Sequence, residues 1–109
     1  MGDRTEALRR IDQLIARLPA RPIKDNVVQQ AARPWAQIAA LYDAIDDDDA
    51  AAEWYRKGAE WAHACGDILG AIVLLKGSLE LRPDDAQSRA LYDQLSQLGE
   101  LGDASDFID

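Results

Sequence analysis

The sequence predicts an all-α protein, and three observations support this. Ala, Leu, Arg, Gln and Glu, which favour helices, dominate the 109 residues. Val27-Val28 and Ile72-Val73 are the only adjacent β-branched pairs, so strand signals are sparse. Apolar residues recur at spacings of three and four over most of the chain. With 48% hydrophobic residues, the chain is long enough for one domain of four or five helices.

The first two helices are predicted over residues 4–18 and 27–45. The first has one apolar face, formed by Leu8, Ile11, Leu14, Ile15 and Leu18, with its arginines mainly on the opposite side. Pro19 and Pro22 end it. Pro34 lies inside the second pattern, so either that helix kinks there or a new helix begins with Pro34 in its first position.

Four consecutive carboxylates, Asp46 to Asp49, separate the second helix from the third. A calcium-binding EF-hand loop opening at Asp46 would need Gly at its sixth position and Glu at its twelfth, where this chain has Ala51 and Lys57. The run therefore predicts an acidic turn. Its last aspartate is expected to cap a third helix over residues 50–65.

Two further helices are predicted over residues 67–81 and 84–98. The first forms a helical hairpin with the third helix, because Gly66-Asp67 marks a turn between them. Asp84 or Asp85 can cap the last helix and Gly99 can end it. Residues 1–99 thus form one helical domain. Residues 100–109 are acidic apart from a few apolar positions and predict a disordered tail.

The hairpin resembles a tetratricopeptide (TPR) repeat over residues 51–85. The first helix of that repeat has Trp, Gly and Tyr at spacings matched here by Trp54, Gly58 and Trp61. In the second helix the small, large and terminal positions are matched by Ala71, Leu75 and Pro83. Ser78 stands where Ala is commoner. The resemblance implies antiparallel hairpins stacked as a short solenoid. In it, the six matching residues other than Ser78 would have a structural packing role.

Charge is distributed unevenly along the chain. Residues 1–33 have a net charge of +3 and residues 34–109 a net charge of −11, for a total of −8. An acidic body repels nucleic acid and anionic membranes, so a protein with a basic surface is the better partner. No segment has the run of about 20 apolar residues that a membrane span needs. A single cysteine, Cys65, excludes an intrachain disulfide and favours a reducing, cytoplasmic location.

Residues that could perform chemistry are few. His63 and Cys65 are two residues apart on a helix, and therefore point about 200° away from each other. No second histidine exists, so a Cys–His catalytic pair and a histidine-based zinc site are both excluded. Cys65 is expected to be buried. No phosphate-binding glycine loop is present. The sequence therefore predicts a non-enzymatic protein without cofactor or metal.

The concave side of stacked hairpins is the expected binding face. Beside the tryptophans of the third helix lie Tyr55, Ala59, Ala62 and His63, which could form a shallow pocket for one large apolar side chain of a peptide. The alternative is that Tyr55 and Ala59 pack against the adjacent helix. The main prediction is thus an adaptor or chaperone-like module that binds a protein or peptide.

Two other hypotheses use different parts of the chain. Phe107 and Ile108, set among acids, could dock the tail into another protein or a neighbouring copy, which allows a homo-oligomer. Alternatively, the acidic body could act as an electrostatic mimic that inhibits a basic or nucleic-acid-binding partner.

Overall fold

The computed structural model describes residues 2–18 and 32–108, which form five helices and no strand. The predicted all-α class is therefore confirmed. The helices are α1 (Gly2–Ala16), α2 (Arg33–Ala44), α3 (Asp48–Ala64), α4 (Ile68–Leu81) and α5 (Ala86–Ile108).

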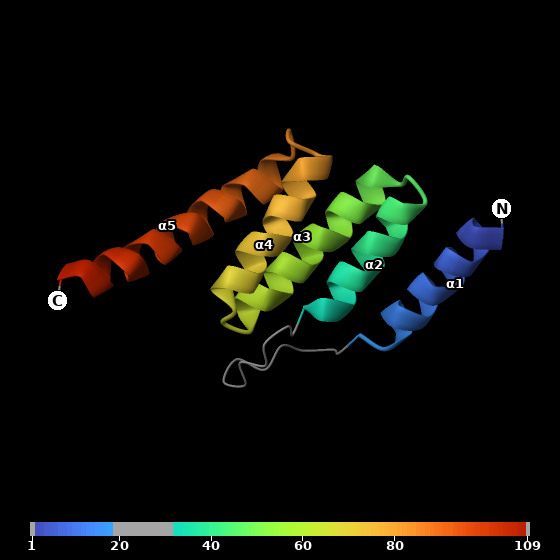
Figure 1. Cartoon of the computed structure of the whole chain (residues 1–109), viewed down its shortest axis with the longest axis horizontal. Helices are drawn as coiled ribbons and strands as arrows, with labels where there is room; N and C mark the ends of the chain where they lie inside the picture. Colours follow the sequence, from blue (N-terminus) through green and yellow to red (C-terminus); the bar gives the residue numbers. More distant parts are fainter. Residues whose placement is uncertain (1, 19–31, 109) are drawn as a thin grey trace.

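The helices follow one another in a row, and each packs against the next (Figure 1). Consecutive helices run in opposite directions, with α1 and α5 at opposite ends of the row. The molecule measures 57 × 31 × 18 Å, and its radius of gyration is 15.1 Å. A compact domain of this length has a radius of gyration of about 13 Å, so the row is elongated.

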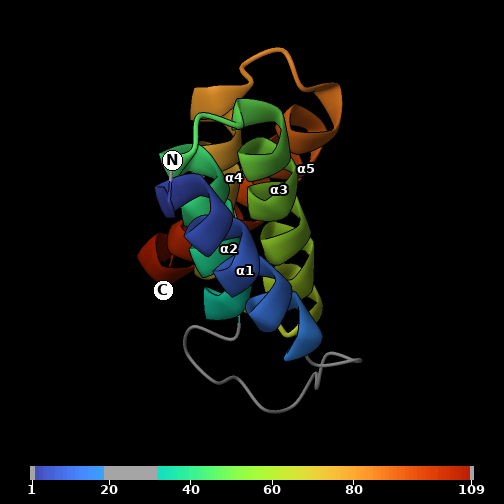
Figure 2. The same cartoon turned by 90° about the vertical axis from the view of Figure 1, so that its right-hand side faces the viewer.

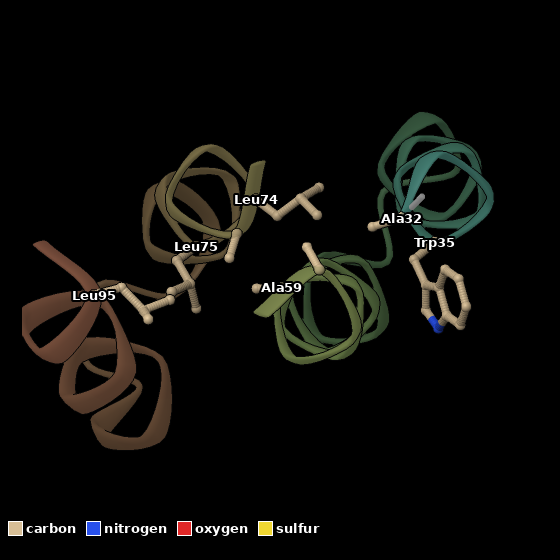
Figure 3. Close-up of a cluster of buried hydrophobic side chains, with 8 residues drawn as sticks. Ala32, Trp35, Ala59, Leu74, Leu75 and Leu95 are labelled. Atoms are coloured by element: carbon tan, nitrogen blue, oxygen red, sulfur yellow. The ribbon is translucent and has the colours of Figure 1, made fainter. Parts of the chain in front are cut away.

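The row is two helices deep. Figure 2 shows α2 and α4 on one side and α3 on the other, and Figure 3 shows the same staggering nearly along the helix axes. α3 therefore lies against both α2 and α4. Its buried residues are all small, which lets both neighbours approach closely: Ala51, Ala52, Gly58, Ala59 and Ala62.

The two turns that flank α3 have the same construction. Asp46 and Gly66 adopt positive φ angles of 63° and 89°, which ends the preceding helix. The residue after each one then caps the next helix: the carboxylate of Asp47 accepts from the Ala50 N–H at 3.2 Å, and that of Asp67 from the Gly70 N–H at 3.0 Å. The predicted turn is thus confirmed, but its capping residue is Asp47 and not the last aspartate, because Asp46 already ends α2.

α2 begins at Arg33, with Pro34 in its first turn. A proline is tolerated there because the first N–H groups of a helix have no partner within it. The described part of the chain thus follows the second alternative, a new helix beginning around Pro34. The earlier part of the predicted helix, residues 27–31, lies outside the described residues.

α5 begins as the sequence predicts and ends later. Asp85 precedes it and accepts a hydrogen bond from the Gln87 N–H at 3.2 Å, as a cap does. The helix continues to Ile108, so the predicted end at Leu98 and the cap at Gly99 are wrong. Residues 100–108, predicted to be a disordered tail, are helical. A single glycine costs a helix only about 1 kcal/mol relative to alanine and need not end it.

α1 is turned relative to the predicted face. Ala7 and Ile11 are buried, while Leu8 and Ile15 are 39% and 37% exposed. The reason is that α1 is the first helix of the row. Among the described helices, α2 is the only one that α1 contacts extensively. A single neighbouring helix covers only part of the apolar face of α1, so the residues at the edge of that face remain exposed.

Candidate protein-binding site

The binding face predicted on α3 is mostly interior. Ala59 and Ala62 have no exposed surface and belong to the core cluster between α2, α3 and α4. They cannot line a pocket for a peptide, and this part of the prediction is wrong. His63 stays partly exposed in the last turn of α3. Tyr55 is partly buried, so the predicted alternative, packing of Tyr55 and Ala59 on a neighbouring helix, describes their positions better.

Tyr55 covers the surface of α4. Its ring lies so close to Gly77 that a Cβ atom built there would be 3.3 Å from Cδ1 of the tyrosine. Burial raises the pKa of the Tyr55 hydroxyl, and the negative charges of Asp43 on α2 and Glu80 on α4 raise it further. Tyr55 thus lies near both helices that flank α3.

The raised pKa of Tyr55 predicts a loss of stability at alkaline pH. The folded protein holds this proton more tightly than the unfolded chain, whose tyrosine pKa is about 10. The neutral Tyr55 hydroxyl therefore makes its full contribution to the free energy of unfolding below about pH 10, and this contribution is lost as the pH rises through the pKa of Tyr55 in the folded protein. In urea titrations above pH 10, Tyr55→Phe should lose less stability with rising pH than the wild type does. Equal slopes for the two proteins would contradict this prediction.

Residues of the TPR-like pattern occupy distinct places in the packing. Ala71 and Leu75 are fully buried in the core, as predicted. Gly58 is buried as well, but it approaches Trp35 of α2 and Leu74 of α4. Trp61 is partly buried and stacks on the same Trp35, with 4.5 Å between ring centroids.

The remaining TPR-like positions lie at the edge of the core. Trp54 is partly buried and lies beneath the Lys57 ammonium, 4.5 Å from its ring centroid. Pro83 is exposed and does not pack; it follows Arg82, which ends α4 and pairs with Asp49 at the start of α3. Pro83 therefore terminates a helix, because it cannot continue the hydrogen-bond pattern, and its predicted packing role is wrong.

Ser78 takes the place of the usual alanine for a specific reason. Its side chain is fully buried, and its hydroxyl lies 2.9 Å from the Ala52 carbonyl of α3 and 2.9 Å from the Ser88 hydroxyl of α5. The Ser88 hydroxyl in turn donates to the Asp85 carboxylate at 2.8 Å. These contacts join α3, α4 and α5, and each of the two buried hydroxyl groups can donate its single proton, that of Ser78 to the Ala52 carbonyl and that of Ser88 to the Asp85 carboxylate.

The structure places a groove where the sequence did not predict one. This groove, of about 520 Å³, lies between the N-terminal halves of α2 and α4, and we call it the α2–α4 groove. Among the described residues its lining is mostly apolar, with one arginine and one aspartate: Ala32, Ala36, Gly70, Val73 and Leu74, with Arg33 and Asp67. Figure 3 shows Leu74 reaching from α4 toward Ala32 of α2.

Two large apolar side chains of α4 are exposed at the groove. Val73, which lines it, is 66% exposed, and Leu69 is 74% exposed. The two are four residues apart and therefore share one face of the helix. Single exposed apolar side chains are common, so the pair is notable only because it is adjacent and because Val73 also lines the groove.

A sequence signal for this surface exists in α4. Its residues from Ile68 to Leu75 are all apolar or glycine, so the segment is hydrophobic around its whole circumference and not on one face only. A helix of that kind is either buried on all sides or leaves an apolar face uncovered. Here α3 and α5 cover two sides, and Leu69 and Val73 remain exposed.

The predicted binding residues at the end of the chain lie far from those predicted on α3. Phe107 and Ile108 belong to the last turn of α5, which points away from the rest of the row (Figure 1). Cys65 is 4% exposed, which confirms that it is a buried cysteine. Tyr55, His63 and the end of α5 thus form no common site.

Comparison with known proteins finds no match: no family model, no curated protein and no solved structure is similar to this chain. Among the described residues, no helix is both long and apolar enough to cross a membrane.

Proposed function

We propose that this chain is a small, non-enzymatic protein-interaction module of the TPR-like kind, an adaptor that binds an apolar segment of a protein partner in the α2–α4 groove. The exposure of Leu69 and Val73 beside this groove carries the proposal. The binding surface replaces the face predicted on α3, whose alanines are buried.

A TPR-like stacking of hairpins is part of the proposal. It is supported by the antiparallel order of α2, α3 and α4, and by their staggering in two layers. The burial of Gly58, Ala71 and Leu75 at the matching positions supports it as well. A cytoplasmic location belongs to the same proposal, for which the single, unpaired and buried Cys65 is the support.

The partner's chemistry follows from the groove and from the charge around it. An apolar lining selects one or two large apolar side chains, spaced by a helical turn to match Leu69 and Val73. The net charge of −11 over residues 34–109 favours basic residues on either side of these anchors. The preferred occupant is therefore a short amphipathic segment with leucine anchors and flanking lysines.

The proposal is tested with two designed peptides that carry the same leucine pair, one flanked by lysines and the other by glutamates. Fluorescence anisotropy should show that the wild-type protein binds the lysine-flanked peptide more tightly. Val73→Asp should weaken this binding at least tenfold, because a carboxylate in the groove would lose its hydration when the peptide covers it. Val73 is mostly exposed, so the substitution should leave the fold intact.

Ile15→Asp is the matched control, since it makes the same kind of change at an exposed apolar residue of α1. It should bind the peptide as the wild type does. Loss of all binding in about 0.5 M salt would favour the acidic surface over the groove as the binding site. Absence of binding to both peptides, or equal binding by Val73→Asp and the wild type, would contradict the proposal.

A further inference from the structure

A second groove, of about 460 Å³, lies between α1 and α2, and we call it the α1–α2 groove. Arg10, Leu14 and Arg17 line it on the side of α1, and Ala40 and Leu41 on the side of α2. Two glutamines complete the described lining, which contains no carboxylate. Both arginines are exposed, and both leucines are partly buried. The groove therefore combines apolar side chains with positive charge, in a protein whose net charge is −8.

The two arginines lie on one face of α1. They are seven residues apart, which places them about 20° from each other around the helix and about 10 Å apart along it, with Leu14 between them. In the described part of the chain, no ion pair involves either arginine. Glu6 shares this face one turn before Arg10, but it does not line the groove. The groove thus offers an apolar side chain with a positive charge about one turn before it and another about one turn after it.

The charge of the groove selects its occupant. Residues 34–109 have a net charge of −11, so Arg10 and Arg17 form a local exception that complements an acidic segment. Nucleic acid and anionic membranes carry extended negative charge, which the acidic body repels, whereas a short segment can contact the groove alone. Residues 19–31 of the same chain do not complement the arginines, because they contain two basic residues and one acidic residue.

The shape of the groove favours a helical occupant. Two neighbouring helices form its sides, and an amphipathic helix packs into such a groove through side chains three, four and seven residues apart. Exposed ion pairs contribute little affinity, so the apolar contact with Leu14 and Leu41 must supply most of it. The arginines then set the register of the bound helix and select against a basic one.

We infer that the α1–α2 groove binds an acidic amphipathic helix of a partner protein. A large apolar side chain of that helix packs against Leu14 and Leu41, and a carboxylate on each side of it pairs with Arg10 and Arg17. Two glutamates seven residues apart with a leucine between them have the matching spacing. The inference goes beyond the proposed function, because the chain then holds two partners of opposite charge in two grooves that share no described lining residue.

The inference is tested by fluorescence anisotropy with a labelled helical peptide that contains one Glu-x3-Leu-x2-Glu segment. The full-length wild type should bind this acidic peptide with an affinity that salt lowers. The affinity should be below that for the lysine-flanked peptide, because the rest of the protein is acidic. Arg10→Glu combined with Arg17→Glu should weaken binding about tenfold or more, since both ion pairs become contacts between like charges.

Ala40, on the side of α2, separates the effect of charge from that of bulk. It is exposed and lines the groove, and Ala40→Glu and Ala40→Gln add side chains of nearly equal size. Ala40→Glu should therefore bind the acidic peptide about fivefold more weakly than Ala40→Gln does. Lys76→Glu combined with Arg89→Glu changes the net charge as the arginine pair does, at exposed positions outside the groove, and should bind as the wild type does.

Four results would overturn the inference. The first is a wild type that does not bind the acidic peptide, and the second is equal binding by the wild type and the variant of Arg10 and Arg17. The third is an equal loss in the variant of Lys76 and Arg89, which would assign binding to overall charge. The fourth is binding of single-stranded DNA, anionic vesicles or a second copy of the chain that depends on the same two arginines, which would give the groove another occupant.

Two further measurements keep the results distinct. Circular dichroism checks that each variant is helical, and the pair of Ala40 variants decides the question if the double arginine variant does not fold. Val73→Asp should bind the acidic peptide as the wild type does, because Val73 lies outside the α1–α2 groove. The double arginine variant should likewise keep its binding of the lysine-flanked peptide, so the two proposals can fail separately.

Discussion

Replacing Gly58 with leucine is expected to destabilise the protein by about 3 kcal/mol or more, a large part of the 5–15 kcal/mol that holds a typical domain folded. A Cβ atom at Gly58 would stand 2.7 Å from the Cβ atom of Trp35 and 3.3 Å from Cδ1 of Leu74. The Trp35 Cβ is fixed to the backbone of α2, so it cannot move by a change of rotamer. Relief of the clash requires α2 and α3 to separate, which loosens the core packing of α3 against both α2 and α4.

Gly77→Ala is the control for this prediction. Both glycines lie inside helices, so each substitution should gain up to about 1 kcal/mol in helix propensity. At Gly77 the new methyl group would meet only the ring of Tyr55, at 3.3 Å, and this ring is partly exposed and can shift. Urea titrations should therefore find Gly77→Ala close to the wild type and Gly58→Leu strongly destabilised. A Gly58→Leu protein of wild-type stability would show that α2 and α3 are not in close contact.

Trp35→Ala is expected to destabilise the protein by about 3–5 kcal/mol. Trp35 is 6% exposed, packs into the core cluster and stacks on Trp61 with an interplanar angle of 27°. Truncation removes the largest side chain of α2 and the stacking partner of α3. Because Trp35 also lies against Gly58, a cavity would open at a close contact between the two helices.

Trp54→Ala is the matched control, since it deletes the same side chain from the edge of the cluster. Trp54 is partly buried and its ring contacts a lysine, so the loss should be smaller, on the order of 1–2 kcal/mol. Chemical unfolding followed by circular dichroism avoids the loss of tryptophan fluorescence in the variants. Equal effects of the two substitutions would contradict the central position assigned to Trp35.

The helices were predictable because their signals are local. Apolar spacing, Pro34, Gly66 and the capping aspartates act within a few residues, and they place four of the five helices to within a few residues inside the described ranges. The end of α5 was not predictable in this way. Its last turns have no strong stop signal, and Gly99 alone does not end a helix whose neighbours continue it.

The candidate binding surface was harder to predict, because the tertiary arrangement decides which face of each helix is covered. On α3, the sequence shows small residues beside large aromatic ones, and we expected the small ones to form a pocket. Two neighbouring helices bury Ala59 and Ala62 instead, and they leave Tyr55 and Trp54 at the edges. On α4, a uniformly apolar sequence gives no preferred face, so the exposure of Leu69 and Val73 became visible only with the helices in place.

By itself, therefore, the sequence determined that this protein is all-helical, where its turns between helices lie, that Cys65 is buried, and that its charge is negative beyond residue 33. These properties depend on residue type and on interactions over one or two helical turns. Only the tertiary structure decided which small residues lie between helices, that Trp35 stacks on Trp61, and that the two grooves lie beside α2. These depend on contacts between residues far apart in the chain, whose geometry is set by the packing of whole helices and is not encoded in any one segment.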